Sequence, residues 1–239
     1  VSHAGYSPYA VSNYTVMLML MCIRKAGYIM FRSHTADYSL GASGAARGME
    51  MQNLTVGVIG TGRIGKAVIH NLSGFGCRLL AYDLYPNDEV KKIAEYVPLE
   101  TLLAESDVIT LHTNATEENH HLIDTKAIES MKPGVTIINT ARGKLIDSDA
   151  LIAGLESGKI GAAGLDVLEN ENGLYYYNRM GDVIPNPELA ALRSMPNVIL
   201  TDHTAFYTHE DVESMVRGVL ESAVAFEKGQ PTRHDVTDL

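Results

Sequence analysis

The segment Gly60-Thr61-Gly62-Arg63-Ile64-Gly65 constrains the fold of this chain more than any other feature, because it fits the pattern G-x-G-x-x-G. An apolar run at residues 56–59 precedes it and a helical stretch follows it, and in that context the pattern indicates a dinucleotide-binding turn. The glycines allow a tight turn and let the backbone approach a pyrophosphate closely. The helix N-terminus then offers free N–H groups and a partial positive charge to the phosphates.

The next apolar run, at residues 77–83, ends in Asp83. An acid about 20 residues beyond the glycines is the group that hydrogen-bonds the adenosine ribose in folds of this kind. A carboxylate there also repels a 2′-phosphate, which favours NAD over NADP. The alternative is a glycine-rich turn that binds no ligand, followed by a surface acid.

The region from residue 53 to residue 204 alternates short apolar runs with helical stretches. The apolar runs are at residues 54–60, 77–83, 106–112, 135–140, 161–167 and 196–202. Fully apolar strands separated by helices indicate a parallel sheet that is covered on both faces. The sequence therefore predicts an α/β fold with a doubly wound parallel sheet, a Rossmann-like NAD-binding domain.

Two further helices are predicted outside this region. Residues 8–26 are apolar almost all round, with Ser7 and Pro8 suited to the helix start and Gly27 to its end. We expect this helix to be buried on more than one side, in the core or at a subunit interface. Residues 35–51 have the composition of a loop, and residues 209–228 have the apolar spacing of a helix that ends at Gly229.

Composition and charge exclude several classes of function. The formal net charge of −10 and the isoelectric point near 5.3 repel phosphate backbones and anionic lipids, so we expect neither a nucleic-acid partner nor a membrane partner. The longest apolar run is too short to span a bilayer, and we expect a cytoplasmic protein. Cys22 and Cys77 lie in apolar surroundings, which predicts buried, reduced thiols.

Three polar residues follow apolar runs late in the chain, namely Arg142, Glu171 and His203. Ligands of a doubly wound sheet bind beyond the carboxyl ends of the strands, so these residues can converge there. The arginine can hold a carboxylate by two parallel bonds, and the histidine can give a proton to a carbonyl oxygen, favoured by the glutamate. Spacing alone supports a simpler interpretation of each residue equally well. Arg142 could be a surface charge, Glu171 one of several acids in its loop, and His203 an ordinary histidine at a strand end.

Two other clusters have simpler explanations. Glu117, His120 and His121 could bind a metal, but adjacent histidines in a strand point to opposite faces and the segment is polar. We therefore predict a solvated loop there and no metal site. The run at residues 175–177 is three tyrosines, which could stack on a ligand, although packing on the domain surface is the better prediction.

Five motifs together are similar to those of the D-2-hydroxyacid dehydrogenases. They are GTGRIG, AYD, NTARG, GLDVLENE and HTAFYT, and their order and spacing match over roughly residues 5–228. HTAFYT, together with YSP near the start, resembles the subgroup that contains D-lactate, D-2-hydroxyisocaproate and D-aryl-lactate dehydrogenases. Asn114 and Asp202 depart from the family pattern, because proline is common at both positions. We expect Asp202 to point to solvent.

The resemblance implies a role for each candidate residue. It implies Arg142 as the substrate-binding arginine, His203 as the acid/base and Glu171 as its partner. For the cofactor it implies Asp83 on the ribose and Asp166 close to the nicotinamide, beside the loop of Gly60, Gly62, Arg63, Ile64 and Gly65. It also implies Tyr6 and Phe206 near the side chain of the substrate.

The resemblance further implies an organisation and an activity. Family members carry a segment before the position of Val1 that forms most of a second, flavodoxin-like substrate domain, so we expect only a remnant of that domain here. Residues 1–52 are expected to form an inter-domain and dimerisation helix and loop, residues 53–204 the NAD-binding domain, and residues 205–239 a helix and tail of the substrate domain. The expected function is NAD-dependent reduction of a small 2-oxo acid to a D-2-hydroxy acid, pyruvate to D-lactate or a bulkier homologue, by a homodimer. The alternative is an NAD(H)-binding module without catalysis, either truncated or sensor-like.

Overall fold

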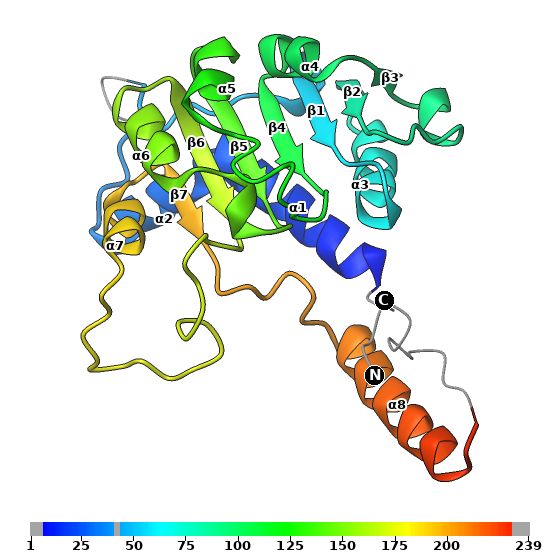
Figure 1. The fold of residues 1–239 in the computed structure, drawn as a ribbon. Coiled ribbons are helices and arrows are strands. Elements are labelled where there is room, and N and C mark those ends of the chain that lie inside the picture. Colours follow the sequence, from blue (N-terminus) through cyan, green and yellow to red (C-terminus); the bar gives the residue numbers. More distant parts are fainter. Residues whose placement is uncertain (1–6, 41–43, 231–239) are drawn as a thin grey trace.

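The chain forms one parallel sheet of seven strands with helices on both faces (Figure 1). The computed structural model describes residues 7–40 and 44–230. The strands are β1 Thr55–Ile59, β2 Arg78–Tyr82, β3 Glu95–Tyr96, β4 Val108–Leu111, β5 Val135–Asn139, β6 Ile160–Leu165 and β7 Val198–Leu200. Their order in the sheet is β3-β2-β1-β4-β5-β6-β7, and every neighbouring pair is parallel. The predicted doubly wound sheet is confirmed.

The order of the strands reverses direction between β1 and β4, which are neighbours in the sheet. Val58 pairs with Thr110 and Ile59 with Leu111, so the two strands end side by side. In open sheets of this kind, ligands bind in the crevice where the strand order reverses, beyond the carboxyl ends of the strands. The G-x-G-x-x-G segment follows β1 directly and therefore lies at this point.

Two apolar cores lie on opposite faces of the sheet, because successive side chains of a buried strand point to opposite sides. In β5, Ile137 belongs to one core and the next residue, Ile138, belongs to the other. The eight helices of the described residues are α1 Pro8–Ile23, α2 Ala26–His34, α3 Arg63–Ser73, α4 Leu99–Glu105, α5 Thr125–Ser130, α6 Ser148–Glu156, α7 Pro187–Ser194 and α8 His209–Glu227. Side chains of α1 and α3 fill one core, and side chains of α4, α5, α6 and α7 fill the other.

The first helix is shorter than the sequence predicts. It ends at Ile23, the chain turns at Lys25 with a left-handed φ of 53°, and α2 starts at Ala26. Gly27 is therefore inside α2 and does not end α1, and the predicted end of the helix was wrong. Within the part of the chain that the structure describes, no single helix is long and apolar enough to cross a membrane, and α1 and α2 reach that length only as a pair bent by 66°.

Burial of α1 agrees with the prediction that it is enclosed on several sides. Leu18 and Met19 are fully buried, and α1 packs against α3, β5 and β6. Cys22 and Cys77 are both free thiols; Cys22 is buried as predicted, whereas Cys77 is only half-buried, and burial raises the pKa of the Cys22 thiol to about 12. A thiol with that pKa stays protonated at neutral pH, so Cys22 acts as a small apolar side chain in the core.

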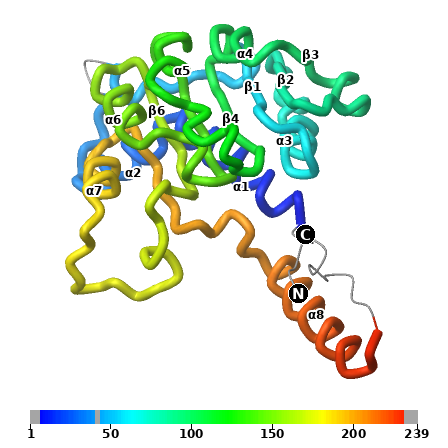
Figure 2. The backbone as a smooth tube through the Cα atoms, viewed as in Figure 1, coloured from blue at the N-terminus to red at the C-terminus, as the bar shows by residue number. Residues whose placement is uncertain are grey.

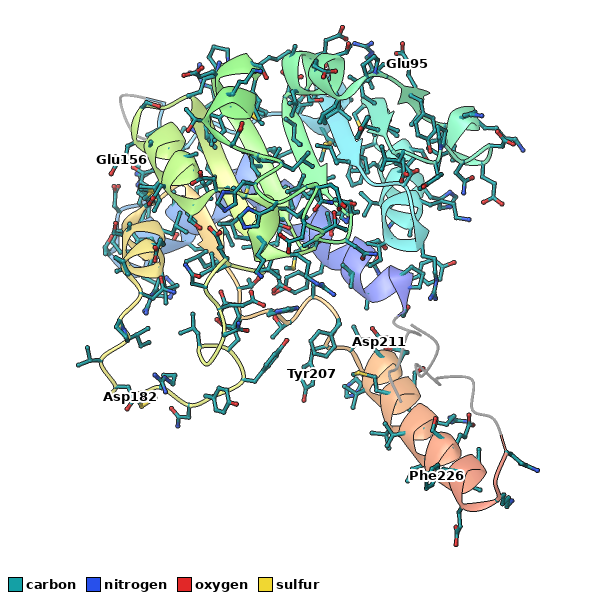
Figure 3. All side chains as sticks on the ribbon, in the orientation of Figure 1. Glu95, Glu156, Asp182, Tyr207, Asp211 and Phe226 are labelled. Atoms are coloured by element: carbon teal, nitrogen blue, oxygen red, sulfur yellow. The ribbon has the colours of Figure 1, made fainter. Side chains whose placement is uncertain are left out.

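Helix α8 extends away from the sheet as a separate arm (Figures 1 and 2). It starts near Asp211 and reaches its far end near Phe226 (Figure 3). The backbone N–H of Ser7, just before α1, donates a 2.6 Å hydrogen bond to the carboxylate of Asp211. The exposed apolar side chains of α8 are Val216, Val219, Leu220, Val224 and Phe226. Such a face suits packing against a further domain, and the assignment of residues 205–239 to a substrate domain stays a prediction.

Candidate functional site

The loop after β1 is shaped by close backbone contacts. Gly60 has a φ of +91°, and a Cβ on it would lie 2.7 Å from the carbonyl oxygen of His112. The N–H of Gly60 donates to the carbonyl of Tyr82 at 2.8 Å, and Gly65 packs directly on the carbonyl of Gly60. Only glycine fits a left-handed backbone at such a contact. The loop is therefore held tightly between β1, β2 and the start of α3.

The outer side of the same loop is open toward a ligand. Gly62 precedes α3, and nothing lies within 4 Å of the position that its Cβ would take. Gly62 itself, the residue before the helix, provides no side-chain cap. Arg63 is exposed at the first position of the helix, whereas Ile64 is half-buried and packs on the core. An open glycine at the N-terminus of a helix fits the pyrophosphate of a dinucleotide.

Asp83 follows β2 and lies against this loop. Its carboxylate accepts hydrogen bonds from the N–H of Thr61 at 2.6 Å and from the N–H of Tyr85 at 2.8 Å. The hydroxyl of Thr61 donates to the same carboxylate at 3.1 Å and accepts from Tyr96 at 2.7 Å. Thr61 and Tyr96 were missed in the sequence, since a variable motif position and a tyrosine of a two-residue strand carry no signal. They fix the carboxylate beside the glycine loop, and its expected contact with the ribose stays a prediction.

The structure brings Glu171 and His203 together although they come from different strand ends. Nδ1 of His203 lies 2.7 Å from Oε1 of Glu171, and the second oxygen of Glu171 accepts from the N–H of Leu168 at 2.8 Å. Both side chains are about one quarter exposed, at 26% for His203 and 22% for Glu171. Glu171 thus engages Nδ1 and leaves Nε2, the other ring nitrogen, unbonded by it.

Asp166 fixes the segment that carries His203. The carboxylate is fully buried after β6 and accepts from the hydroxyl of Thr201 at 2.6 Å, the N–H of Thr204 at 3.0 Å and the N–H of Ala205 at 2.9 Å. A carboxylate with three donors forms strong, charge-assisted hydrogen bonds. The structure therefore gives Asp166 an anchoring role that the sequence did not reveal. Its expected place close to the nicotinamide stays a prediction.

Aromatic rings surround the imidazole of His203. The centroids of Tyr175, Tyr176 and Phe206 lie 6.5, 5.8 and 6.5 Å from the centroid of His203. Tyr175 is buried, and its burial, followed by the charge of Glu171, raises the pKa of its hydroxyl. Tyr176 and Tyr177 are exposed, so the predicted surface packing holds for them and was wrong for Tyr175.

The three tyrosines at 175–177 line a cavity of about 640 Å³ next to β7, together with Arg179, Asp202 and Thr204. Asp202 is exposed at its rim, as expected. Asn114, the other departure from the family pattern, is also exposed, and its carbonyl accepts from the side chain of Asn119 at 2.7 Å. Tyr6 lies outside the described residues, and Phe206 is half-buried beside His203.

Arg142 lies at the same edge of the sheet, shortly after β5, but does not bond the pair. Its guanidinium is exposed and donates to the carbonyl of Ala141 at 2.6 Å. Within the described ranges it makes no hydrogen bond to Glu171 or His203. The next residue, Gly143, packs against the carbonyl of Leu168 so closely that a Cβ would overlap it. This contact places the loop that carries Arg142 beside the segment that leads to Glu171.

The two adjacent histidines near this edge lie in a loop, as predicted, but their rings stack on each other. The ring centroids of His120 and His121 are 3.9 Å apart. The opposite orientation that neighbouring side chains take in a strand does not apply, because the residues lie in a turn with His121 at a left-handed φ of 52°. His121 bonds Glu169 at 2.5 Å, so this part of the loop is not simply solvated, while Glu117 is exposed and takes no part.

Comparisons with known proteins agree with this geometry. The model of the D-isomer specific 2-hydroxyacid dehydrogenase family, NAD binding domain, matches residues 16–205. An aromatic 2-oxoacid reductase of Clostridium sporogenes is 46% identical over 224 residues, which are 93% of this chain and 67% of that protein. A D-lactate dehydrogenase of Escherichia coli is 42% identical over 227 residues, which are 95% of this chain and 68% of that protein.

Solved structures are similar over nearly the whole chain. A pyruvate reductase of Chlamydomonas reinhardtii superimposes with a TM-score of 0.92 at 37% identity, over 98% of this chain and 70% of that one. A D-lactate dehydrogenase of Lactobacillus jensenii, determined with NAD⁺, superimposes with a TM-score of 0.88 at 34% identity, over 98% and 70% of the two chains.

Proposed function

Because this chain belongs to the D-isomer specific 2-hydroxyacid dehydrogenases and carries their NAD-binding domain, we propose that it reduces a small 2-oxo acid to the D-2-hydroxy acid with His203 as its acid/base. It is an NAD-dependent oxidoreductase acting on 2-oxo acids. The observation that carries the proposal is the 2.7 Å contact between Nδ1 of His203 and Glu171, at the edge of the sheet where the glycine loop also lies. A histidine held in this way suits proton transfer through its free Nε2.

The chemistry needs three groups of this chain. When bound, NADH supplies the hydride that reaches the carbonyl carbon of the substrate. Arg142, once turned from the carbonyl of Ala141, binds the substrate carboxylate through two parallel hydrogen bonds. His203 donates a proton from Nε2 to the carbonyl oxygen, and Glu171 holds the imidazole in place through Nδ1.

Two relatives and the aromatic rings near His203 indicate the class of substrate. The names of these relatives refer to aromatic 2-oxoacids and to D-lactate. Phe206 and Tyr176 lie beside the imidazole with their ring centroids 6.4 Å apart. We propose that Phe206, with Tyr6, contacts the side chain of the substrate, which ranges from the methyl group of pyruvate to a bulkier apolar group.

The test follows NADH absorbance with the purified chain and pyruvate, 2-oxoisocaproate or phenylpyruvate, and measures NADH binding in parallel. We expect NADH binding and steady NADH loss with at least one acid, and loss of turnover in His203→Ala and Arg142→Ala without loss of NADH binding. Turnover that survives His203→Ala would contradict its role as acid/base. Failure to bind NADH would contradict the proposal as a whole.

A second candidate is an NAD(H)-binding module without catalysis. It is favoured by Arg142, whose guanidinium bonds the carbonyl of Ala141 and, within the described residues, makes no hydrogen bond to Glu171 or His203. NADH binding without turnover of any of the three acids would support it. Turnover abolished by His203→Ala would exclude it.

We propose that the protein is a homodimer joined through residues 1–52. Helix α2 exposes Ile29, Met30 and Phe31, and the following segment exposes Tyr38 and Leu40. Adjacent exposed apolar side chains of this size are typical of an interface between subunits. Light scattering after size exclusion tests the proposal, because Phe31→Ser is expected to shift the mass toward the monomer, whereas an unchanged monomeric mass for the wild-type chain would refute it.

A further inference from the structure

Three potential metal ligands meet beside the proposed catalytic pair without belonging to it. One ligand atom from each of His120, His121 and Glu169 lies within 4.8 Å of the other two. Nε2 of His121 is 2.5 Å from Oε1 of Glu169, and Nε2 of His120 is 3.9 Å from the same oxygen. We propose that these three side chains bind one divalent transition-metal ion such as Zn²⁺. The proposal does not depend on the proposed function.

The fold builds this cluster from two strand ends. The loop after β4 carries both histidines, and the N–H of His121 donates to the carbonyl of Lys144 at 2.9 Å. Ile123 then forms a β-bridge with Ile146, which fixes the loop to the segment that follows β5. Glu169 comes from the segment that follows β6. The loop is thus attached to the framework on which Glu169 lies.

The left-handed backbone at His121 puts both imidazoles on one side of the loop. At a φ of 52° the alternation of side chains expected of an extended chain is lost, and the two rings stack at an interplanar angle of 28°. A left-handed conformation is uncommon for a residue other than glycine, although histidine is among those that adopt it. Here the left-handed backbone at His121 lets the imidazoles of both His120 and His121 lie near the carboxylate of Glu169.

The distances suit a single ion after a small movement. Zinc binds imidazole nitrogen at about 2.0–2.1 Å and carboxylate oxygen at about 2.0–2.2 Å, so two ligands on one ion lie roughly 3–4 Å apart. The separation of 3.9 Å between His120 and Glu169 already falls in this range. The hydrogen-bonded pair of His121 and Glu169, at 2.5 Å, must separate by roughly 1 Å. The ion would then replace the shared proton, which is released to solvent.

The surroundings support the ligands and leave the site accessible. The hydroxyl of Ser148 donates to Oε2 of Glu169 at 3.1 Å, which leaves Oε1 for the ion. Nδ1 of His121 lies 3.6 Å from the carboxylate of Asp147, the position of an acid that orients a metal-bound imidazole. The side chain of His120 is 45% exposed and that of Glu169 is 18% exposed. An ion can therefore enter from solvent, and water can complete its coordination.

The donor set selects the class of metal. Imidazole nitrogens with one carboxylate suit zinc, copper, nickel and cobalt better than magnesium or calcium, which prefer oxygen ligands only. We therefore expect Zn²⁺ and Co²⁺ to bind and Mg²⁺ to compete poorly. Cobalt is a useful probe because its visible absorption reports nitrogen and oxygen ligands directly.

The test titrates the chelator-treated full chain with Zn²⁺ by calorimetry and with Co²⁺ by visible absorption. His120→Gln is the main variant, because the side chain is exposed and its loss leaves the bond between His121 and Glu169 in place. Glu169→Gln is the second variant, with circular dichroism to check its fold. His70→Gln, an exposed histidine on α3, and Glu117→Gln, an exposed acid of the same loop, are the matched controls.

We expect one tight equivalent of metal in the wild-type chain and in both controls. Loss of one of three ligands is expected to weaken binding by about tenfold or more in His120→Gln and in Glu169→Gln, at least as much as loss of an outer-shell partner does. Wild-type binding no tighter than that of His120→Gln would overturn the proposal. An equal loss of affinity in His70→Gln or Glu117→Gln would overturn it as well, since binding would then be adventitious.

Discussion

The hydroxyl of Tyr176 donates a 2.9 Å hydrogen bond to the backbone carbonyl of His203. Both residues have a left-handed backbone, with φ values of 67° and 55°. Such conformations cost energy in residues other than glycine and persist where the surrounding contacts fix them. This bond joins the loop after β6 to the segment after β7, next to the pair formed by His203 and Glu171.

Removal of this hydroxyl is expected to reduce activity without affecting the cofactor loop. In Tyr176→Phe the carbonyl of His203 loses its donor, so the imidazole is held less firmly. We expect kcat/KM to fall by about fivefold, the equivalent of ~1 kcal/mol for one hydrogen bond, with an unchanged Kd for NADH. Tyr177→Phe, at an exposed neighbouring position, is the control. Equal kinetics in the two variants would contradict a positioning role for Tyr176.

The charge of Asp83 is expected to determine the preference between NADH and NADPH. In Asp83→Asn the amide oxygen can still accept from Thr61, although the amide NH2 then faces the N–H of Tyr85, and the repulsion of a 2′-phosphate is lost. We expect the ratio of Kd for NADPH to Kd for NADH to fall by about tenfold, or ~1.4 kcal/mol. Fluorescence titration with both cofactors measures it, and an unchanged ratio would show that Asp83 does not face the ribose.

Asp166 is expected to contribute strongly to stability, because its buried carboxylate accepts three hydrogen bonds. In Asp166→Asn one oxygen becomes an amide donor that faces other donors. We expect the free energy of unfolding in urea to fall by about 2–3 kcal/mol. Asp182→Asn, an exposed control 3.5 Å from Arg179, should change it by less than about 0.5 kcal/mol. Similar effects in the two variants would argue against the anchoring role.

Acid is expected to destabilise the fold through His112. Burial lowers the pKa of His112 from 6.5 to about 3, and its Nε2 lies 3.0 Å from the hydroxyl of Thr110. Between these two pKa values the unfolded chain binds the proton and the folded chain does not. The contribution of the neutral ring to stability is therefore complete above about pH 6.5 and is lost as the pH falls toward about 3.

Urea unfolding at several pH values between about 7 and about 5 measures this effect. We expect the wild-type chain to lose at most about 1.4 kcal/mol for each pH unit through this histidine. His112→Gln removes the titrating group, so its unfolding free energy should depend less steeply on pH. Parallel pH dependences for the two chains would mean that His112 is protonated equally easily in both states.

The sheet and the cofactor loop were predictable because local patterns determine them. The apolar runs around Val58 and Ile137 require burial on both faces of the sheet, and the contact between Gly60 and His112 admits no Cβ. The meeting of Glu171 with His203 followed from the rule that carboxyl ends of parallel strands share an edge. These features depend on residue type and order, which the sequence states directly.

The features that the sequence did not predict depend on single backbone torsions. A left-handed lysine at position 25 divides the first helix, and a left-handed histidine at position 121 stacks two rings that an extended chain would separate. Lysine rarely adopts this conformation, and histidine, although it adopts it more readily, does not specify it. The anchoring bonds of Asp166 also escaped prediction, because their partners lie 35 to 39 positions away in the chain.

The bond between Ser7 and Asp211 has a mechanical consequence for the arm formed by α8. The arm is attached to the sheet by the covalent chain at residues 206–208 and, beside it, by this 2.6 Å hydrogen bond at the start of α1. Any movement of α8 must therefore keep its first turn close to the start of α1 or break this bond. His203 lies outside α8, and Asp166 fixes the two residues that follow it, Thr204 and Ala205. A swing of the arm would therefore leave the imidazole in place against Glu171.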